Sequence, residues 1–207
     1  MSTIANSKPW FQKRLRPTAE VLAHAGISAN QVTLVTMGLS LSTGTAVLLH
    51  LDTPAILWLI PCALLVRLAN NHIDGLLAKE HGMQTPLGGI LNELADVVCD
   101  AALYLPLAWI AGISSGLVVL SVFLGFMTEM VGITAVSVGA TRRKDGPMSK
   151  RGRGVAFAGI AMALAVGTAP GTWLDVTLAL LCFALLLTVL KRIHGALQER
   201  VIRCSLH

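Results

Sequence analysis

Two polar stripes stand out near the middle of an otherwise apolar chain. Side chains three and four residues apart share a face of a helix. Asn71 and Asp74 therefore form one stripe. Asn92, Asp96 and Asp100 form the second. Oxygen donors with no His or Cys among them suit Mg²⁺ or Mn²⁺ better than zinc. Because ionisable groups at membrane depth are costly, their clustering predicts a polar metal-binding cavity.

The segment between the stripes predicts how they meet. A short turn at residues 80–86, EHGMQTP, returns the chain, so the two stripes are expected to face each other across an antiparallel helix pair. Gly75, Ala78 and Gly88 lack bulk, which lets a ligand or a helix come close. The plainer alternative places the carboxylates at solvated helix ends. Asp96 lies too far into an apolar segment for that alternative.

The whole chain has the composition of an integral membrane protein. Of its 207 residues, 54% are hydrophobic and 13% are charged, whereas soluble domains carry about 25% charged residues. The mean hydropathy is +0.70. No removable signal peptide is expected, because the first residues hold no apolar run with a cleavage site. The four cysteines lack metal-binding or disulfide-framework spacing, which predicts free thiols.

Six apolar windows can be placed on the chain, each near the roughly 20 residues that a bilayer core requires. The predicted spans are residues 31–50, 54–79, 86–110, 115–139, 153–169 and 172–191. Before them, residues 9–26 mix aromatic, aliphatic and basic side chains, which predicts a helix in the interface plane, with a plain basic tail as the alternative. We therefore predict an all-α fold, with a single domain over residues 1–207 that combines six transmembrane helices and an N-terminal interfacial helix.

The basic residues predict the orientation. All 16 lysines and arginines except Arg67 lie at the N-terminus, at the end of the second span, in the fourth connection or after the sixth span. The positive-inside rule then makes both termini cytoplasmic in a multi-pass protein, in the inner membrane if the source is bacterial. The charge of +5 describes a membrane face in contact with lipid. No nucleic-acid module is recognisable, which argues against a nucleic-acid partner.

The polar stripes resemble the signature of the CDP-alcohol phosphatidyltransferases, D-x2-D-G-x2-A-R-x8-G-x3-D-x3-D. Every spacing of the signature is kept, at Asn71, Asp74, Gly75, Ala78, Lys79, Gly88, Asn92 and Asp96. Residues 27–44, ISANQVTLVTMGLSLSTG, are similar to the start of the family's first membrane helix. The predicted six-helix topology also agrees with that family.

The resemblance implies a set of roles. In the family, four acids hold two divalent ions, the ions hold the donor's pyrophosphate, and the fourth acid is the proposed base. That base would here be Asp96. The expected ligands of Mg²⁺ or Mn²⁺ are Asn71, Asp74, Asn92 and Asp96, with Asp100 and Glu93 as possible substitutes for the missing acids. The expected donor-binding residues are Gly75, Ala78, Lys79 and Gly88.

The implied reaction transfers a phosphatidyl group from CDP-diacylglycerol or another CDP-alcohol to the hydroxyl of an acceptor, with release of CMP, in phospholipid biosynthesis. The acceptor would be a small polar or lipid alcohol. Sequence alone leaves open which alcohol it is and whether the protein forms a homodimer.

Three departures from the signature leave alternatives open: Asn71 and Asn92 replace acids, and Lys79 replaces Arg. With two acids missing, two divalent ions should be held poorly unless a donor supplies its phosphates. The site could hold a single ion, assemble only with donor bound, or have lost its chemistry. In the last case the protein would bind a CDP-linked lipid or assist a partner without turnover. A transporter or structural membrane protein is a further alternative, which the lack of an inverted repeat and of broken midplane helices disfavours.

The basic residues outside the signature each have two possible roles. Arg67 lies inside a span and should be paired, with Glu129 as the expected partner, or it should grip phosphate. Lys150, Arg151 and Arg153 begin the fifth span and would neutralise a phosphate of donor or acceptor, as a basic cluster does at a similar point in the family. Their alternative is attraction to anionic lipid.

Overall fold

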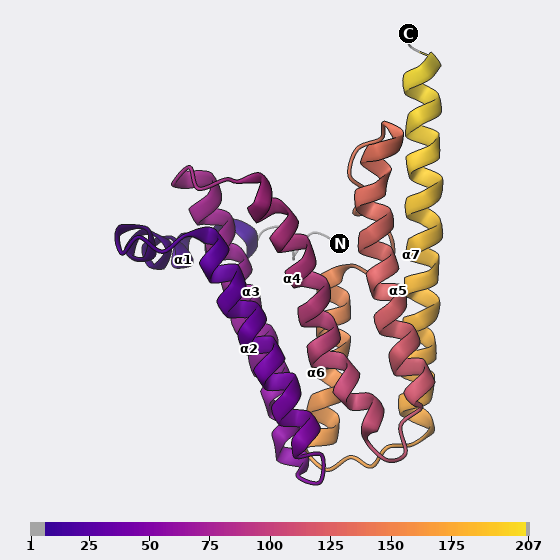
Figure 1. Cartoon of the computed structure of the whole chain (residues 1–207). Coiled ribbons are helices and arrows are strands. Elements are labelled where there is room, and N and C mark those ends of the chain that lie inside the picture. Colours follow the sequence, from indigo (N-terminus) through magenta and orange to yellow (C-terminus); the bar gives the residue numbers. More distant parts are fainter. Residues whose placement is uncertain (1–6, 206–207) are drawn as a thin grey trace. The chain divides into compact units, whose positions relative to one another are not determined.

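The computed structural model describes residues 7–205, with side chains placed for residues 14–201. The described residues form helices joined by short connections, without a strand, which confirms the all-α class (Figure 1). The helices in chain order are α1 (Ser7–His24), α2 (Ala29–Leu49), η1 (Pro54–Trp58), α3 (Leu59–Glu80), α4 (Pro86–Tyr104), η2 (Leu105–Trp109), α5 (Ser115–Thr134), η3 (Ala135–Val138), α6 (Lys150–Ala165) and α7 (Thr172–Ser205).

Helices stand at all six predicted spans, but they differ in their fitness to cross a membrane. Within the described residues, four stretches are long and apolar enough: Ala29–Leu49, Pro54–Glu80, Ser115–Val138 and Thr172–Val201. The other two helices are α4, which carries the second polar stripe, and α6, which has 16 residues. Four membrane-spanning candidates are therefore established by length and composition, and the count of six remains a prediction. A helix at α1 agrees with the predicted N-terminal helix, whose place in the interface is also still a prediction.

The chain divides into two compact units, each built from separated segments. Unit 1 comprises Met1–Thr45 and Cys62–Leu103, and unit 2 comprises Ala46–Pro61 and Tyr104–His207. The single domain expected over residues 1–207 stays a prediction. Unit 1 holds both polar stripes, one on α3 and one on α4.

Local signals in the sequence start the helices of unit 1. Ser28 and Gln31 form a reciprocal cap at the start of α2, in which the Ser28 hydroxyl accepts from the Gln31 amide at 3.3 Å and the Gln31 side chain accepts from the Ser28 amide at 2.8 Å. Thr85 starts α4, because its hydroxyl accepts from the Gly88 amide at 2.9 Å. Pro86 is the first residue of α4, where its missing N–H costs no hydrogen bond.

Close packing then brings the helices of unit 1 together. One apolar cluster joins α1, α2 and α3 through Ala19, Ala29, Val32, Ile73, Leu76 and Leu77. Gly44 of α2 lies against α4, since a Cβ there would come within 2.0 Å of the Ala102 carbonyl oxygen. Only glycine permits that approach, which holds α4 beside α2.

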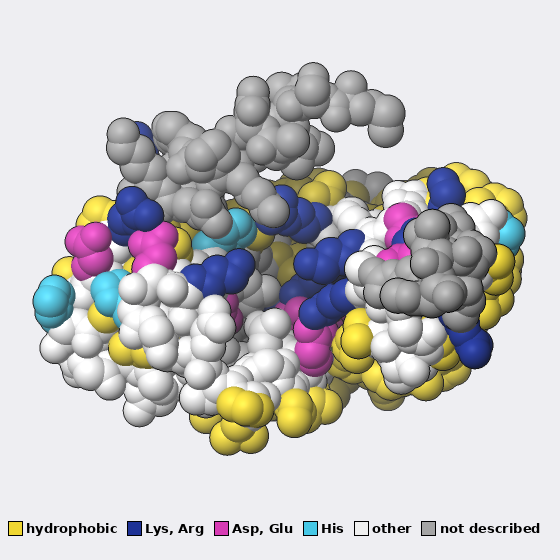
Figure 2. Space-filling view, turned by 90° about the horizontal axis from the view of Figure 1, so that it is seen from above, with side chains coloured by type: hydrophobic (Ala, Val, Ile, Leu, Met, Phe, Trp, Pro, Cys, Tyr) yellow, Lys and Arg dark blue, Asp and Glu magenta, His cyan; other side chains and the backbone are white. Residues whose placement is uncertain are grey.

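Unit 2 is built around α5 and α7, which run side by side (Figure 1). The rings of Tyr104 and Phe157 stack with centroids 3.9 Å apart and planes 6° apart. Large apolar side chains of α5 and α7 remain exposed, among them Phe123, Leu180 and Phe183. Exposed apolar side chains in such number suit a lipid environment. Figure 2 shows lysine and arginine side chains, and also exposed hydrophobic side chains, on the surface seen there.

Candidate active site

The first stripe lies on the last turns of α3, as the spacing predicts. Asp74 is buried, with 9% of its surface exposed. The Thr33 hydroxyl of α2 lies 3.2 Å from Asp74 Oδ2 and 3.1 Å from the Ala29 carbonyl oxygen. Asn71 and Gly75 are half-buried on the same helix, and Lys79 is exposed near its end. The buried Asp74 carboxylate of α3 is therefore oriented by the Thr33 hydroxyl of α2.

The second stripe lies on α4 and is tied to α3 by an arginine. Asp100 is buried, and Asn92 and Asp96 are half-buried. Arg67 of α3 is only 4% exposed. Its Nη2 donates to the Asp96 carbonyl oxygen at 2.8 Å and to Asp96 Oδ1 at 3.3 Å. Its Nη1 donates to Asp100 Oδ1. These contacts show that the two stripes lie on neighbouring helices, as the short turn predicts.

The expected pairing of Arg67 with Glu129 is wrong. Arg67 pairs with Asp96 and Asp100 of its own unit, and Glu129 pairs with Arg153 and Arg192 in unit 2. The sequence held the signal for this. In an antiparallel helix pair, residues at the same distance from the connecting turn lie opposite each other. Arg67 and Asp100 are about equally far from the turn at residues 80–86, so they lie opposite each other. Its burial in this pair favours an ion pair over the predicted role in gripping phosphate.

Two α2 residues that the sequence did not single out, Thr33 and Thr36, contact polar side chains of α3. Thr33 meets Asp74, and the Asn70 side-chain amide donates to Thr36 Oγ1 at 2.9 Å. The available signal was the family-like start of the first membrane helix, which contains both threonines. α2 therefore supplies hydroxyl groups to the polar face of unit 1.

The two glycines expected to bind the donor have different surroundings. A Cβ on Gly75 would meet nothing within 4 Å. A Cβ on Gly88 would lie 2.5 Å from Asn30 Oδ1 and 3.0 Å from Thr85 Oγ1. Gly75 thus leaves open space beside Asp74, whereas Gly88 gives room to the side chain of Asn30. The donor-binding role of both, and of Ala78 and Lys79, remains a prediction.

The chemistry of the donor set fits a hard divalent ion. The four signature residues offer carboxylate and amide oxygens from two neighbouring helices, and Asp74 and Asp96 supply the negative charge. Across the described part of the chain, no group of three or more His, Cys, Asp or Glu side chains is placed to hold a metal. Asn71 and Asn92 replace acids, so the four signature residues include two carboxylates.

The predicted phosphate-binding cluster begins α6 in unit 2, where its members differ. Ser149 caps α6 by accepting from the Gly152 amide at 3.2 Å. Arg153 is 3% exposed, and its Nη1 donates to Thr128 Oγ1 at 2.9 Å and to Glu129 Oε1 at 3.4 Å. Lys150 is half-buried and Arg151 is exposed. Arg153 therefore belongs to a buried polar network.

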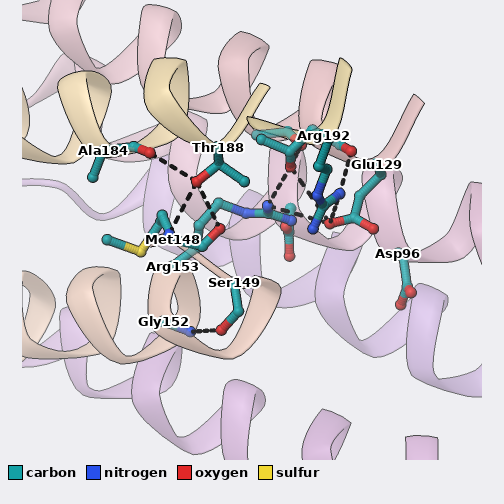
Figure 3. Close-up of polar contacts among 12 residues, drawn as sticks. Asp96, Glu129, Met148, Ser149, Gly152, Arg153, Ala184, Thr188 and Arg192 are labelled. Atoms are coloured by element: carbon teal, nitrogen blue, oxygen red, sulfur yellow. Dashed lines mark hydrogen bonds and ion pairs between the residues drawn. The ribbon is translucent and has the colours of Figure 1, made fainter. Parts of the chain in front are cut away.

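Arg192 of α7 is the second arginine of that network and was read in the sequence only as a flanking charge. It is 3% exposed. Its Nη1 donates to the Thr128 carbonyl oxygen and lies 3.8 Å from Glu129 Oε1. Its Nε donates to the Asp145 carbonyl oxygen at 3.1 Å. Figure 3 shows Arg153 and Arg192 converging on Glu129, so one carboxylate serves two buried guanidinium groups.

Glycines of α5 make this burial sterically feasible. A Cβ on Gly125 would lie 3.1 Å from Arg153 Cδ. A Cβ on Gly132 would lie 3.1 Å from Arg192 Nη1 and 2.7 Å from the Arg143 carbonyl oxygen. Both arginines therefore lie against parts of α5 that carry no side chain.

Comparison with known proteins agrees with this geometry. The family profile of the CDP-alcohol phosphatidyltransferases matches residues 27–190. The inner membrane protein YnbA of Escherichia coli K12 is 36% identical over 195 residues, which cover 94% of this chain and 96% of that protein. The phosphatidylinositol phosphate synthase of Mycolicibacterium smegmatis is 28% identical over 193 residues, which cover 89% of this chain and 84% of that enzyme.

Solved structures share the fold. The phosphatidylinositol phosphate synthase of Mycobacterium tuberculosis with CDP-DAG bound has a TM-score of 0.75 at 20% identity, over 88% of this chain and 92% of that one. The same enzyme in complex with manganese and citrate has a TM-score of 0.70 at 20% identity, over 88% of each chain. With several apolar helices and an inner membrane relative, the protein is a multi-pass membrane protein. The chain belongs to the CDP-alcohol phosphatidyltransferase family.

Proposed function

We propose that the protein transfers a phosphatidyl group from CDP-diacylglycerol to the hydroxyl of an acceptor alcohol and releases CMP. The observation that carries this proposal is the pair Asp74 and Asp96 at the signature spacing on neighbouring helices α3 and α4. The M. tuberculosis enzyme with CDP-DAG bound shares the fold, which supports a CDP-linked lipid as donor.

The signature residues would prepare the donor. Asn71, Asp74, Asn92 and Asp96 would hold Mg²⁺ or Mn²⁺, which supplies Lewis-acid stabilisation of the pyrophosphate charge when bound. The Thr33 hydroxyl contacts the Asp74 carboxylate, which would be one of the ligands of this ion. The open space at Gly75 would admit the donor beside Asp74.

Asp96 would act as the base. Its carboxylate takes the proton of the acceptor hydroxyl, and the acceptor oxygen then forms a bond to the lipid-side phosphorus. The bond from that phosphorus to the CMP phosphate breaks, and CMP leaves with the electron pair. Arg67 donates to both the carbonyl and the carboxylate of Asp96, which fixes the side chain for this task.

Other basic residues would bind phosphates. Lys79 would meet the donor phosphates as a point charge, with a looser grip than the fork of an arginine. Lys150 and Arg151 at the start of α6, with Arg153, are the proposed ligands of an acceptor phosphate. The M. smegmatis relative is named for the synthesis of phosphatidylinositol phosphate, so inositol phosphate belongs among the acceptors to be tried.

The test is CMP release by the purified protein. The protein in detergent is given CDP-diacylglycerol, Mg²⁺ or Mn²⁺, and in turn glycerol phosphate, serine, inositol phosphate and a phospholipid acceptor. We expect CMP release with at least one acceptor and its loss in Asp96→Asn. Binding of CDP-diacylglycerol with no CMP release from any acceptor would support the alternative, a family member that binds lipid without turnover.

We also propose that both termini are cytoplasmic, because the basic residues flank the spans on one side. Tags at either terminus should be inaccessible from outside intact cells, whereas a tag in the connection at residues 111–115 should be accessible. Termini that report opposite sides would show that the number of spans is odd.

A further inference from the structure

Arg67 places a fixed positive charge inside the signature. Its guanidinium stays protonated in proteins. At 4% exposure it donates to Asp96 at two atoms and to Asp100 at one. Asp96 is both a signature acid and the proposed base, so this cation contacts the catalytic machinery directly.

The carboxylates of the two stripes and Arg67 together match the charge of one ion when no donor is bound. Asp74, Asp96 and Asp100 carry −3, and Arg67 carries +1, which leaves −2. One divalent ion neutralises that charge. Two would leave +2 at partly buried groups, which is costly until a donor adds its own negative charge.

The asparagines fit the same count. Asn71 and Asn92 still offer amide oxygens to an ion but add no charge. Asp100, the substitute ligand expected from the sequence, directs Oδ1 toward Arg67. The two asparagines and the buried arginine therefore both make the net charge of the site less negative.

We propose that the donor-free site takes a single divalent ion and that Arg67 supplies the positive charge that a second ion would otherwise supply. Asp100 is then the counter-ion of Arg67. This inference rests on the proposed function only in assuming that the signature residues hold a metal.

The test counts bound Mn²⁺ by electron paramagnetic resonance of the free ion, on the full chain in detergent without a CDP-linked donor, whose phosphates would add negative charge. We expect one ion per chain for the unaltered protein. The double variant Asn71→Asp with Asn92→Asp brings the charge to −4 and should bind two.

Charge variants test Arg67 itself. Arg67→Gln leaves −3 and should tighten the first ion by about tenfold or more, since an opposing unit charge within several ångströms is removed. Asp100→Asn leaves −1 and should weaken it. The double variant Arg67→Gln with Asp100→Asn returns to −2 and should restore an affinity near that of the unaltered protein. It removes both members of a buried pair, so it still gives a result if either single variant fails to fold.

Arg16→Gln is the matched control, because Arg16 pairs with Glu80 at the exposed end of α3. It should leave the ion count and affinity unchanged. Two ions or none in the unaltered protein, or an affinity that does not follow the charge series, would overturn the inference. The proposed function is judged separately by CMP release, so an active protein with two ions refutes only the single-ion site.

Discussion

The two units treat buried arginine in opposite ways. In unit 1, one guanidinium lies between two carboxylates, as Arg67 does with Asp96 and Asp100. In unit 2, two guanidinium groups share one carboxylate, as Arg153 and Arg192 share Glu129. The group in unit 1 therefore has a net charge of −1, and the group in unit 2 has a net charge of +1. A group with more carboxylates than guanidinium groups suits a cationic ligand, and a group with more guanidinium groups suits an anionic one. The groups in the two units are therefore suited to different ligands.

The first prediction removes carboxylates from the acidic stripes of unit 1. Asp74→Ala and Asp96→Ala remove the two charged signature ligands, and Asp96→Ala also removes the proposed base. We expect each to lower CMP release by roughly 10³-fold or more, since the ion and general-base contributions are each large. Initial rates of CMP release measure this. Glu93→Gln on α4 is the comparison and should keep most of the rate; a similar loss there would mean that Glu93 takes the place of a missing ligand.

The second prediction removes the carboxylate from the arginine-rich group of unit 2. Glu129→Gln leaves Arg153 and Arg192 without their shared carboxylate, and an uncompensated buried charge costs about 3 to 5 kcal/mol. We expect a large fall in the thermal midpoint of the solubilised protein. Glu199→Gln, which loses contacts to Thr141 and Arg143 outside that network, should cause a smaller fall. Equal falls would show that the buried network has no special share in stability.

The third prediction sharpens the role of the missing acids. With only −2 in the signature region, divalent binding should be weak in the protein alone and should tighten when a CDP ligand supplies its phosphates. Calorimetry with Mg²⁺ or Mn²⁺, with and without CDP-diacylglycerol, measures the change. Asn71→Asp with Asn92→Asp should reduce this dependence on nucleotide, because the protein then supplies the charge itself. Equally tight binding by the unaltered protein in both states would contradict the prediction.

The fourth prediction separates two signature glycines. Gly88→Ala would place a Cβ 2.5 Å from Asn30 Oδ1, so we expect a loss of stability of about 1 to 3 kcal/mol from overpacking. Gly75→Ala meets nothing within 4 Å and should fold normally. If Gly75 admits the donor, its variant should instead raise the KM for CDP-diacylglycerol. Adding Asn30→Ala should recover the stability of Gly88→Ala; no recovery would show that Asn30 is not the obstacle.

Much of unit 1 could be predicted from the sequence because its signals are local. Helical spacing placed Asn71 with Asp74 and Asn92 with Asp96, and the turn predicted neighbouring helices. The partner of Arg67 was missed because it was sought in another span rather than by register around the turn. Glu129 with Arg192 joins α5 to α7 across distant sequence, which no local pattern encodes. The third and fifth predicted spans are not among the four candidates, since α4 carries three carboxylates and α6 has only 16 residues.

The last prediction concerns a smaller effect in unit 2, in the connection between η3 and α6. Burial alone would raise the pKa of Asp145, but hydrogen bonds from Arg143 and the backbone, with the charges of Arg143 and Arg192, outweigh it and lower that pKa below its usual range. A carboxyl group with a lowered folded-state pKa adds stability above its unfolded pKa of about 3.9 and loses it as pH falls through the folded value. Asp145→Asn should therefore lower the thermal midpoint at pH 7, and the difference from the unaltered protein should shrink as pH falls below about 4. Thermal unfolding of both proteins from pH 7 to pH 3 measures this. A difference that stays constant over that range would show that Asp145 acts through packing, and the charge of Arg143 would then have no part in holding the connection.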